Sequence, residues 1–194
     1  MDGETIDILA SLAGCEAEVS KITEAAMAGE LDFFESLTRR VAFLKGVDAA
    51  KAKSRCADLP FIEGAGDIIK GLKGAGYKVV VFSGGFSMGT APAREKLGFD
   101  MDFSNKLHEK DGVLTGLVGG EMMYSDSKGV MLQKLQALLG VSIEDTIAVG
   151  DGANDASMFE FAAKKIAFCA KPKLKEAANI VIDTKDLREI GKYI

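Results

Sequence analysis

The sequence predicts an α/β protein in which helices cover a mostly parallel sheet, preceded by a helical N-terminal segment. Residues 5–59 contain few strand-forming runs, and their apolar residues recur at the three- and four-residue spacing of helices. After Pro60, short apolar runs alternate with helical patterns, the arrangement that produces parallel strands with crossover helices. At 194 residues the chain is long enough to bury a substantial core.

The N-terminal segment is expected to consist of helices and loops. One helical face carries Ile6, Leu9 and Ala13, and another carries Phe33 and Leu37. No proline interrupts this segment, so nothing in it forces a helix to break.

From residue 60 onward, glycines and turn residues separate the expected elements. Helices are expected at 64–75, 87–97, 128–139, 156–161 and 173–178, and strands at 77–82, 146–149, 166–169 and 180–182. Ser83-Gly84-Gly85 is expected to form the turn between the first of these strands and the helix that follows. Lys110-Asp111-Gly112 predicts a β-hairpin within 107–123, because an Asp-Gly pair suits a tight two-residue turn.

Composition excludes several classes of protein. The net charge of −5 and the lack of a long basic cluster argue against a general nucleic-acid binder. No apolar run approaches the ~20 residues of a membrane span, and the acidic, polar N-terminus does not resemble a secretory signal. Cys15, Cys56 and Cys169 are odd in number and widely separated, so we expect buried free thiols in the reducing cytoplasm.

The segment from Ile147 to Asp155 is the most informative part of the chain. An apolar run that reads as a buried strand leads through Gly150 into Asp151 and Asp155, with Gly152 and Asn154 between the two aspartates. Carboxylate and amide oxygens gathered at a strand's end suit Mg²⁺, which usually acts beside a phosphate. The alternative is a turn whose acidic residues cap the next helix.

Ser83 and Lys128 are candidate anion-binding residues. Ser83 follows a Val-rich strand and precedes a helix, so its hydroxyl and nearby N–H groups could face an anion. It could equally be the N-cap of an ordinary strand-to-helix turn. Lys128 opens a helix, where a cation opposes the helix dipole, which favours a role such as neutralising a phosphate. The alternative is an exposed surface lysine.

The N-terminal helices carry further candidates. Of the adjacent Arg39 and Arg40, one could face inward and bind a carboxylate in a bidentate manner, or both could be exposed. By spacing alone, Met27 and Phe33 are core residues. No Ser-His-Asp or Cys-His arrangement is evident, which argues against hydrolases of those kinds.

Together these segments resemble the phosphoserine phosphatase family of the haloacid dehalogenase (HAD) superfamily over essentially the whole chain. The matching segments are, in order, Glu4-Thr5-Ile6-Asp7, Arg40, Val81-Phe82-Ser83-Gly84-Gly85-Phe86, Lys110-Asp111-Gly112, Lys128-Gly129, Val149–Phe159 and Ile166–Pro172. A series this long in the right order is more specific than any single motif. The resemblance implies a helical cap domain at 1–60 and a Rossmann-like core at 61–194 with a β-hairpin near 107–123.

The resemblance also implies Mg²⁺-dependent hydrolysis of O-phospho-L-serine to L-serine and phosphate through an aspartyl-phosphate, as a step of serine biosynthesis. The residues that it assigns to phosphate and metal are Ser83, Gly84, Lys128, Asp151, Asn154 and Asp155. Ser83 and Gly84 would bind phosphoryl oxygens, and Lys128 would neutralise their charge. Asp151 would coordinate Mg²⁺, and the remaining two residues would support this network.

For the rest of the substrate, the resemblance implies a grip on a small zwitterion. Glu4 and Arg40 would bind its amino and carboxylate groups, while Met27 and Phe33 close over it. A cap of this kind excludes water during phosphoryl transfer. The expected partner is a small phosphomonoester, and no binding to nucleic acid or membrane is expected. The expected assembly is a monomer or a homodimer.

One family motif is absent from the printed sequence. The family's first strand ends in Asp-x-Asp a few residues before the segment that starts at Glu4, and its aspartates act as nucleophile and general acid. Asp2 falls after that motif and is not expected to attack phosphorus. We therefore expect the first core strand to be missing, leaving a gap of roughly 9–10 Å in the sheet, and the natural protein to continue upstream. The alternatives are an inactive phosphoserine-binding protein and a HAD phosphotransferase that acts on another acceptor.

Overall fold

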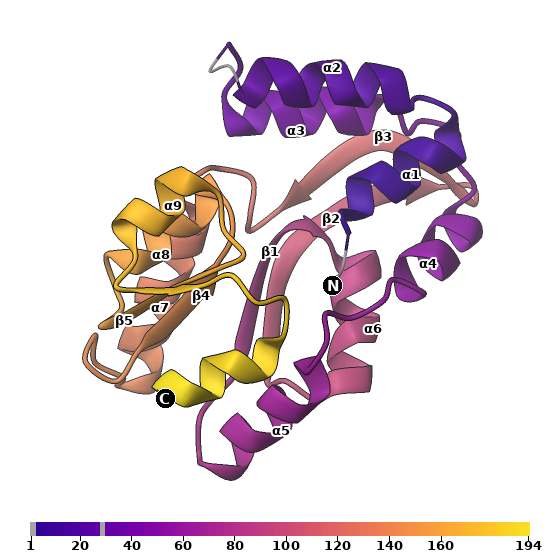
Figure 1. The fold of residues 1–194 in the computed structure, drawn as a ribbon. Helices are drawn as coiled ribbons and strands as arrows, with labels where there is room; N and C mark the ends of the chain where they lie inside the picture. Colours follow the sequence, from indigo (N-terminus) through magenta and orange to yellow (C-terminus); the bar gives the residue numbers. More distant parts are fainter. Residues whose placement is uncertain (1–2, 28–29) are drawn as a thin grey trace. The chain divides into compact units, whose positions relative to one another are not determined.

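The computed structural model describes residues 3–27 and 30–194, whose contacts separate into two compact units. The first unit contains the described residues up to Phe61 together with Ile69–Tyr124, and the second contains Ile62–Ile68 and Ser125–Ile194. Figure 1 shows the elements of both. The expected division into a cap at 1–60 and a core at 61–194 stays a prediction. Asp2 lies outside the described residues.

The N-terminal part of the first unit is helical, as the apolar spacing predicted. Its helices are α1 (Thr5–Ala13), α2 (Glu16–Met27), α3 (Phe33–Ala42) and α4 (Ala49–Ala57), and α5 (Ala65–Gly74) follows. Helices α2 and α3 lie side by side (Figure 1). The Asp32 side chain accepts a hydrogen bond from Glu35 N–H at 2.7 Å and so fixes where α3 begins.

A three-stranded sheet follows in the first unit, with the order β1-β2-β3. Its strands are β1 (Val80–Phe86), β2 (Met101–Lys110) and β3 (Val113–Gly120). Strands β1 and β2 are parallel and are connected through α6 (Ser87–Leu97), which packs on both. The predicted hairpin is confirmed: β2 and β3 are antiparallel, and Asp111 and Gly112 take φ angles of 52° and 80° between them.

The prediction for Ser83–Gly85 was wrong, because these residues belong to β1 instead of forming a turn. Phe82 pairs with Phe103 and Phe86 pairs with Asn105, so three residues of β1 stand opposite a single residue of β2. Such a bulge forms only when a neighbouring strand sets the register. The composition of one strand does not reveal it.

The buried core of the first unit joins the N-terminal helices to the sheet. Its members include Leu9 of α1, Leu44 after α3 and Cys56 of α4, together with Phe86 of β1 and Leu114 of β3. All five side chains are essentially inaccessible to water. Burial of this apolar surface stabilises the unit and holds the helices against the strands.

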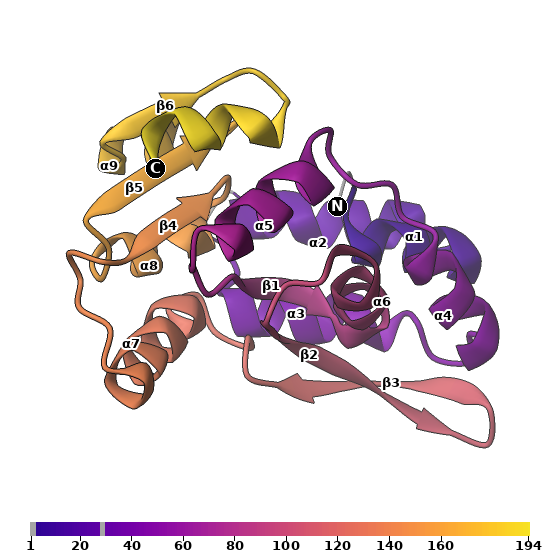
Figure 2. The same ribbon diagram turned by 90° about the horizontal axis from the view of Figure 1, so that it is seen from below.

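The second unit contains a parallel sheet with the order β4-β5-β6 (Figure 2). Its elements are α7 (Ser127–Leu139), β4 (Ile147–Gly150), the short 3₁₀ helix η1 (Ala153–Asp155), α8 (Ala156–Phe159), β5 (Lys164–Phe168), α9 (Pro172–Ala177), β6 (Ile180–Ile182) and η2 (Leu187–Tyr193). The sequence did not predict η2. This 3₁₀ helix places Ile190 against Ile166 and Ile182 of the sheet.

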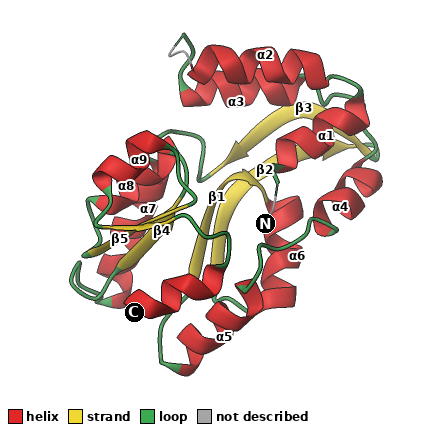
Figure 3. Ribbon diagram, viewed as in Figure 1, coloured by secondary structure: helices red, strands yellow, loops and turns green. Residues whose placement is uncertain are grey.

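The predicted α/β class is confirmed, with helices throughout both units and three of the four strand pairings parallel (Figure 3). Among the described residues, the strands form two three-stranded sheets. No helix in the described part of the chain is long and apolar enough to cross a membrane. Cys15 and Cys56 are buried free thiols as expected, but Cys169 is exposed, because it lies just after β5 in a turn with φ 46°.

Candidate active site

The expected site residues fall into two local groups, one in each unit. Glu4, Phe33, Arg40, Ser83 and Gly84 belong to the first unit. The second unit holds a group whose members are Lys128, Asp151, Asn154 and Asp155.

In the first unit, the β1 bulge places the Ser83 hydroxyl beside the backbone N–H group of Gly85. Ser83 Oγ accepts a hydrogen bond from Gly85 N–H at 3.1 Å, which leaves the hydroxyl proton available to another acceptor. Ser83 is not a helix N-cap, because that position before α6 is occupied by Phe86. The bulge therefore offers the Ser83 hydroxyl proton to an acceptor, and its role in binding an anion stays a prediction.

Gly85 allows α1 to approach this bulge closely. A Cβ atom at Gly85 would lie 2.6 Å from Thr5 Oγ1 and 3.2 Å from Ser83 Oγ, so a larger residue would displace one of them. Thr5 is buried at the start of α1, directly after Glu4. No sequence pattern indicated that Thr5 contacts the bulge.

Arg40 is the inward-facing member of the arginine pair. Arg39 is exposed and bonded to Glu35 at 3.3 Å, whereas Arg40 is half-buried, with its Nε donating to Ser36 O at 3.2 Å. Burial lowers the pKa of the Arg40 guanidinium from its usual value, while the negative charges of Glu4 and Asp7 act in the opposite direction. The structure thus brings Glu4 and Arg40 within electrostatic range of each other.

The structure gives less information about Phe33 and Met27, the two apolar residues expected to contact the substrate. Phe33 is the first residue of α3, is partly buried and packs against the core of the first unit. Met27 is the last residue of α2, and its side chain lies outside the described part of the structure.

In the second unit, Lys128 and Asp155 form a buried ion pair. The Lys128 Nζ atom donates to Asp155 Oδ1 at 2.6 Å, and the exposed fractions of the side chains are 11% and 4%. Lys128 is therefore not an exposed surface lysine. An ammonium group has three donors, so this pairing leaves others for a phosphate oxygen.

The Asp155 carboxylate also organises the loop after β4. Its Oδ2 atom accepts from the N–H groups of Asp151 and Gly152, both at 2.9 Å, and its side chain does not cap α8. Gly150 permits this arrangement, because a Cβ there would lie 2.3 Å from Asp155 Cβ. The loop is thus folded around Asp155, whose carboxylate bonds the N–H of Gly152 at the start of η1 and does not cap α8.

Asp151 lies in an electrostatically unfavourable position. Its pKa is raised above the usual value, first by desolvation and second by the charge of Asp155, with Lys128 acting in the opposite direction. The residue nevertheless remains exposed on one side. Its carboxylate has no ion-pair partner among the described residues. A bound cation would relieve this unfavourable charge.

The Lys128 helix is locked to the Asp loop by a residue that the sequence analysis missed. Ser157 Oγ accepts from Gly129 N–H at 3.1 Å and donates to Asn154 O at 3.2 Å. A Cβ at Gly129 would lie 2.4 Å from Ser157 O, so α7 and α8 can meet only at a glycine. In the sequence, the only indication of this contact was the glycine that directly follows Lys128.

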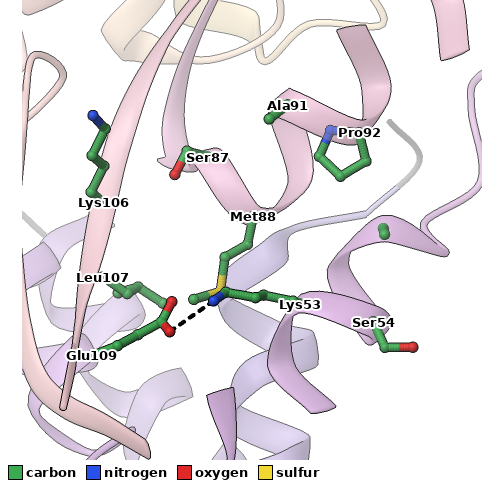
Figure 4. A pocket seen from close by; sticks show the side chains of 10 residues that line it. Lys53, Ser54, Ser87, Met88, Ala91, Pro92, Lys106, Leu107 and Glu109 are labelled. Carbon is green, nitrogen blue, oxygen red and sulfur yellow. Dashed lines mark hydrogen bonds and ion pairs between the residues drawn. The ribbon is translucent and has the colours of Figure 1, made fainter. Parts of the chain in front are cut away.

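A separate pocket in the first unit lies between α4, α6 and β2 (Figure 4). None of its lining residues is an expected site residue. Its Lys53 is already neutralised by Glu109, with 2.8 Å between Nζ and Oε2. We assign this pocket no role.

Comparison with known proteins identifies close relatives. The sequence matches the model of the haloacid dehalogenase-like hydrolase family over residues 3–162. A phosphoserine phosphatase of Wolinella succinogenes is 62% identical over 194 residues, covering 100% of this chain and 94% of the relative. The one from Methanocaldococcus jannaschii is 51% identical, covering 100% and 92%.

Solved structures show the same similarity. A substrate-bound phosphoserine phosphatase complex has a TM-score of 0.93 at 51% identity, covering 100% of this chain and 92% of that chain. A structure described as a phospho-aspartyl intermediate analogue of phosphoserine phosphatase gives the same values.

Proposed function

This chain belongs to the haloacid dehalogenase-like hydrolase family, and we propose that it hydrolyses O-phospho-L-serine to L-serine and phosphate with Mg²⁺ as cofactor. The observation that carries the proposal is 62% identity across the whole chain to a phosphoserine phosphatase. The two local groups offer side chains suited to binding the phosphate, the metal ion and the charged groups of the amino acid, and the nucleophile and general acid of the family's first motif are not among them.

Phosphate binding falls to Ser83, Gly84 and Lys128 in this proposal. The Ser83 hydroxyl keeps a proton to donate, and the buried Lys128 ammonium keeps donors and a positive charge. Phosphoryl transfer depends mainly on positioning and on stabilising negative charge, which such preorganised donors provide.

The donor set in the second unit fits Mg²⁺. Asp151 supplies a carboxylate without a cationic partner, and Asn154 supplies an amide oxygen nearby. No group of three His, Cys, Asp or Glu side chains gathers within the described ranges, but Mg²⁺ usually takes one or two carboxylates and completes its shell with water and phosphate oxygens. When bound, the cation supplies charge neutralisation at the phosphoryl group.

Substrate selection falls to Glu4 and Arg40. A carboxylate and a guanidinium within electrostatic range of each other suit the two charged groups of an amino acid. In this proposal, Met27 and Phe33 cover the substrate and exclude water. Asn154 and Asp155 support the phosphate and metal network from the loop after β4.

Composition supports the cellular setting that we propose. Three free cysteines suit the reducing cytoplasm, and a net charge of −5 suits a small-molecule partner better than a nucleic acid. We place the reaction in L-serine biosynthesis and propose a monomer or homodimer.

Two measurements test the proposal. The first is the release of phosphate from O-phospho-L-serine in the presence of Mg²⁺, and the second is the binding of O-phospho-L-serine, measured by calorimetry. Release supports the proposal, and its loss on Asp151→Asn would assign the metal role. Release that requires added homoserine would indicate a phosphotransferase. Binding without release would indicate a non-catalytic phosphoserine-binding protein, and neither binding nor release would contradict the substrate assignment.

A further inference from the structure

Asn105 of β2 connects three segments of the first unit through its buried amide. Its Nδ2 group donates to Gly84 O at 3.1 Å and to Met122 O at 3.0 Å, and its Oδ1 accepts from Met122 N–H at 3.0 Å. The residue is 0% exposed. Exchanging the amide O and N would set an oxygen against two carbonyl oxygens, so the bonding network defines the orientation.

The position of Asn105 in the sheet explains why its side chain can reach both partners. It pairs with Phe86 of β1 on one side and with Gly120 of β3 on the other. Gly120 has φ +147°, and a Cβ there would lie 2.7 Å from Asn105 Cα and 2.9 Å from Oδ1. A side chain at position 120 would therefore push the amide out of place.

The bond to Gly84 supplies a partner that the strand ladder does not. The ladder between β1 and β2 pairs none of Ser83–Gly85 with a residue of β2. Backbone groups left unpaired in a bulge need other partners, and the Asn105 amide provides one for the Gly84 carbonyl.

Fixing this carbonyl also fixes the N–H group that touches Ser83. The Gly84 carbonyl and the Gly85 N–H belong to one planar peptide unit and point in opposite directions. With the carbonyl held by Asn105, the N–H is directed at Ser83 Oγ, 3.1 Å away. The Ser83 oxygen accepts this bond, and its proton remains free for a phosphoryl oxygen.

We propose that Asn105 is a positioning residue for phosphate binding, acting through the Gly84–Gly85 peptide unit to orient the Ser83 hydroxyl. The inference rests on the proposed function, which assigns the phosphate to Ser83 and Gly84. Asn105 itself does not touch the phosphate, so its effect is on the geometry of the donors.

Two variants separate this role from a general contribution to stability. Asn105→Asp keeps an acceptor for Met122 N–H but can no longer donate to Gly84 O. In Asn105→Ser the side chain is too short to reach Gly84 or Met122. The matched control is Thr90→Val, because Thr90 is equally buried in the same unit and its hydroxyl contacts Asp102 at 2.6 Å and Ser104 at 3.0 Å.

The measured quantity is the Kd of inorganic phosphate with Mg²⁺, by calorimetry, beside the Tm of each variant. We expect either Asn105 variant to weaken phosphate binding by about tenfold or more, whereas Thr90→Val stays within about twofold at a comparable Tm loss. Unchanged binding in the Asn105 variants, or equal weakening in the control, would overturn the inference.

If neither Asn105 variant folds, the unaltered protein still tests the inference. Titration with phosphate should shift the NMR signals of the Asn105 side-chain amide and the Gly85 N–H together, while the side-chain amide of Gln136, bonded within the second unit, serves as reference. No shift at Asn105 would overturn the inference.

Phosphate binding does not require turnover, so the two proposals fail separately. A protein that binds phosphate through Asn105 but releases none from phosphoserine refutes only the proposed hydrolysis. A protein that hydrolyses phosphoserine regardless of residue 105 refutes only the positioning role.

Discussion

The ammonium of Lys128 lies 2.6 Å from the carboxylate of Asp155, and 11% and 4% of their side-chain surfaces are exposed. The same carboxylate accepts two backbone N–H groups of the loop after β4. One buried pair therefore holds both the proposed phosphate-binding cation and the loop that carries Asp151.

Lys128→Met should destabilise the protein strongly. It leaves the Asp155 carboxylate buried without a counter-charge, so we expect the free energy of unfolding to fall by about 3–5 kcal/mol in urea denaturation. Lys175→Met is the control, because Lys175 pairs with Asp183 at the surface, with 33% and 63% of the side chains exposed. Its loss should be at most about 1 kcal/mol. Equal losses of unfolding free energy in the two variants would show that the buried Lys128–Asp155 pair contributes no more than a surface pair.

Mg²⁺ should stabilise the protein through Asp151. We expect the Tm to rise with added Mg²⁺, by a free energy of about 2.7 kcal/mol at a hundred times the Kd. Asp151→Asn should abolish this rise. Without Mg²⁺ the variant should be no less stable, because the raised pKa of Asp151 shows that its charged form is disfavoured in the fold. Asp145→Asn, in the same unit, is the control, and its Tm should rise with Mg²⁺ as in the unaltered protein. The same rise in Asp151→Asn would exclude Asp151 as a ligand of the metal.

Arg40→Met should lower kcat/KM for phosphoserine by about 10- to 100-fold, because a charged partner of the substrate carboxylate is lost. O-Phosphoethanolamine lacks that carboxylate, so its turnover should change little. The adjacent Arg39→Met is the control, since Arg39 is exposed and bonded to Glu35. Equal losses on both substrates would place Arg40 outside the carboxylate site.

The three thiols should react very unequally. Burial raises the pKa of Cys56 to about 11 and also raises that of Cys15, so both remain protonated and inaccessible at pH 8. Cys169 is exposed. A thiol titration should therefore count one reactive group in the native protein, none in Cys169→Ser, and three in unfolded wild type. More than one fast thiol in the native protein would contradict the burial of the other two.

Acid should remove a contribution that Asp100 makes to stability. Its pKa is lowered, first by the hydrogen bond from Val79 N–H at 2.9 Å and also by Lys73. A carboxyl whose folded pKa is depressed stabilises the fold above its unfolded pKa near 3.8, and this contribution is lost as the pH falls further. Asp100→Asn should therefore narrow the stability difference between pH 6 and pH 3, measured by urea unfolding. An unchanged difference would contradict the assignment, and Asp58→Asn is the control.

Local sequence patterns predicted the elements well wherever a local cause sets them. Helical spacing predicted the helical segment that contains α1 to α4, and the Asp111-Gly112 pair placed the hairpin, because positive φ angles suit these residues. The turn expected at Ser83–Gly85 failed, since the bulge depends on pairing with β2. The exposure of Cys169 was missed for a similar reason, because it depends on how the chain turns after β5.

The sequence by itself determined the α/β class, the order of the main helices and strands, and the motif series that indicates a HAD hydrolase. Only the tertiary structure decided that Lys128 is buried against Asp155 and that Asn105 holds Gly84. These contacts join residues 27 and 21 positions apart. Helical and strand periodicity reports which face of an element is apolar, whereas a hydrogen bond between distant residues depends on strand register and on the packing of whole elements.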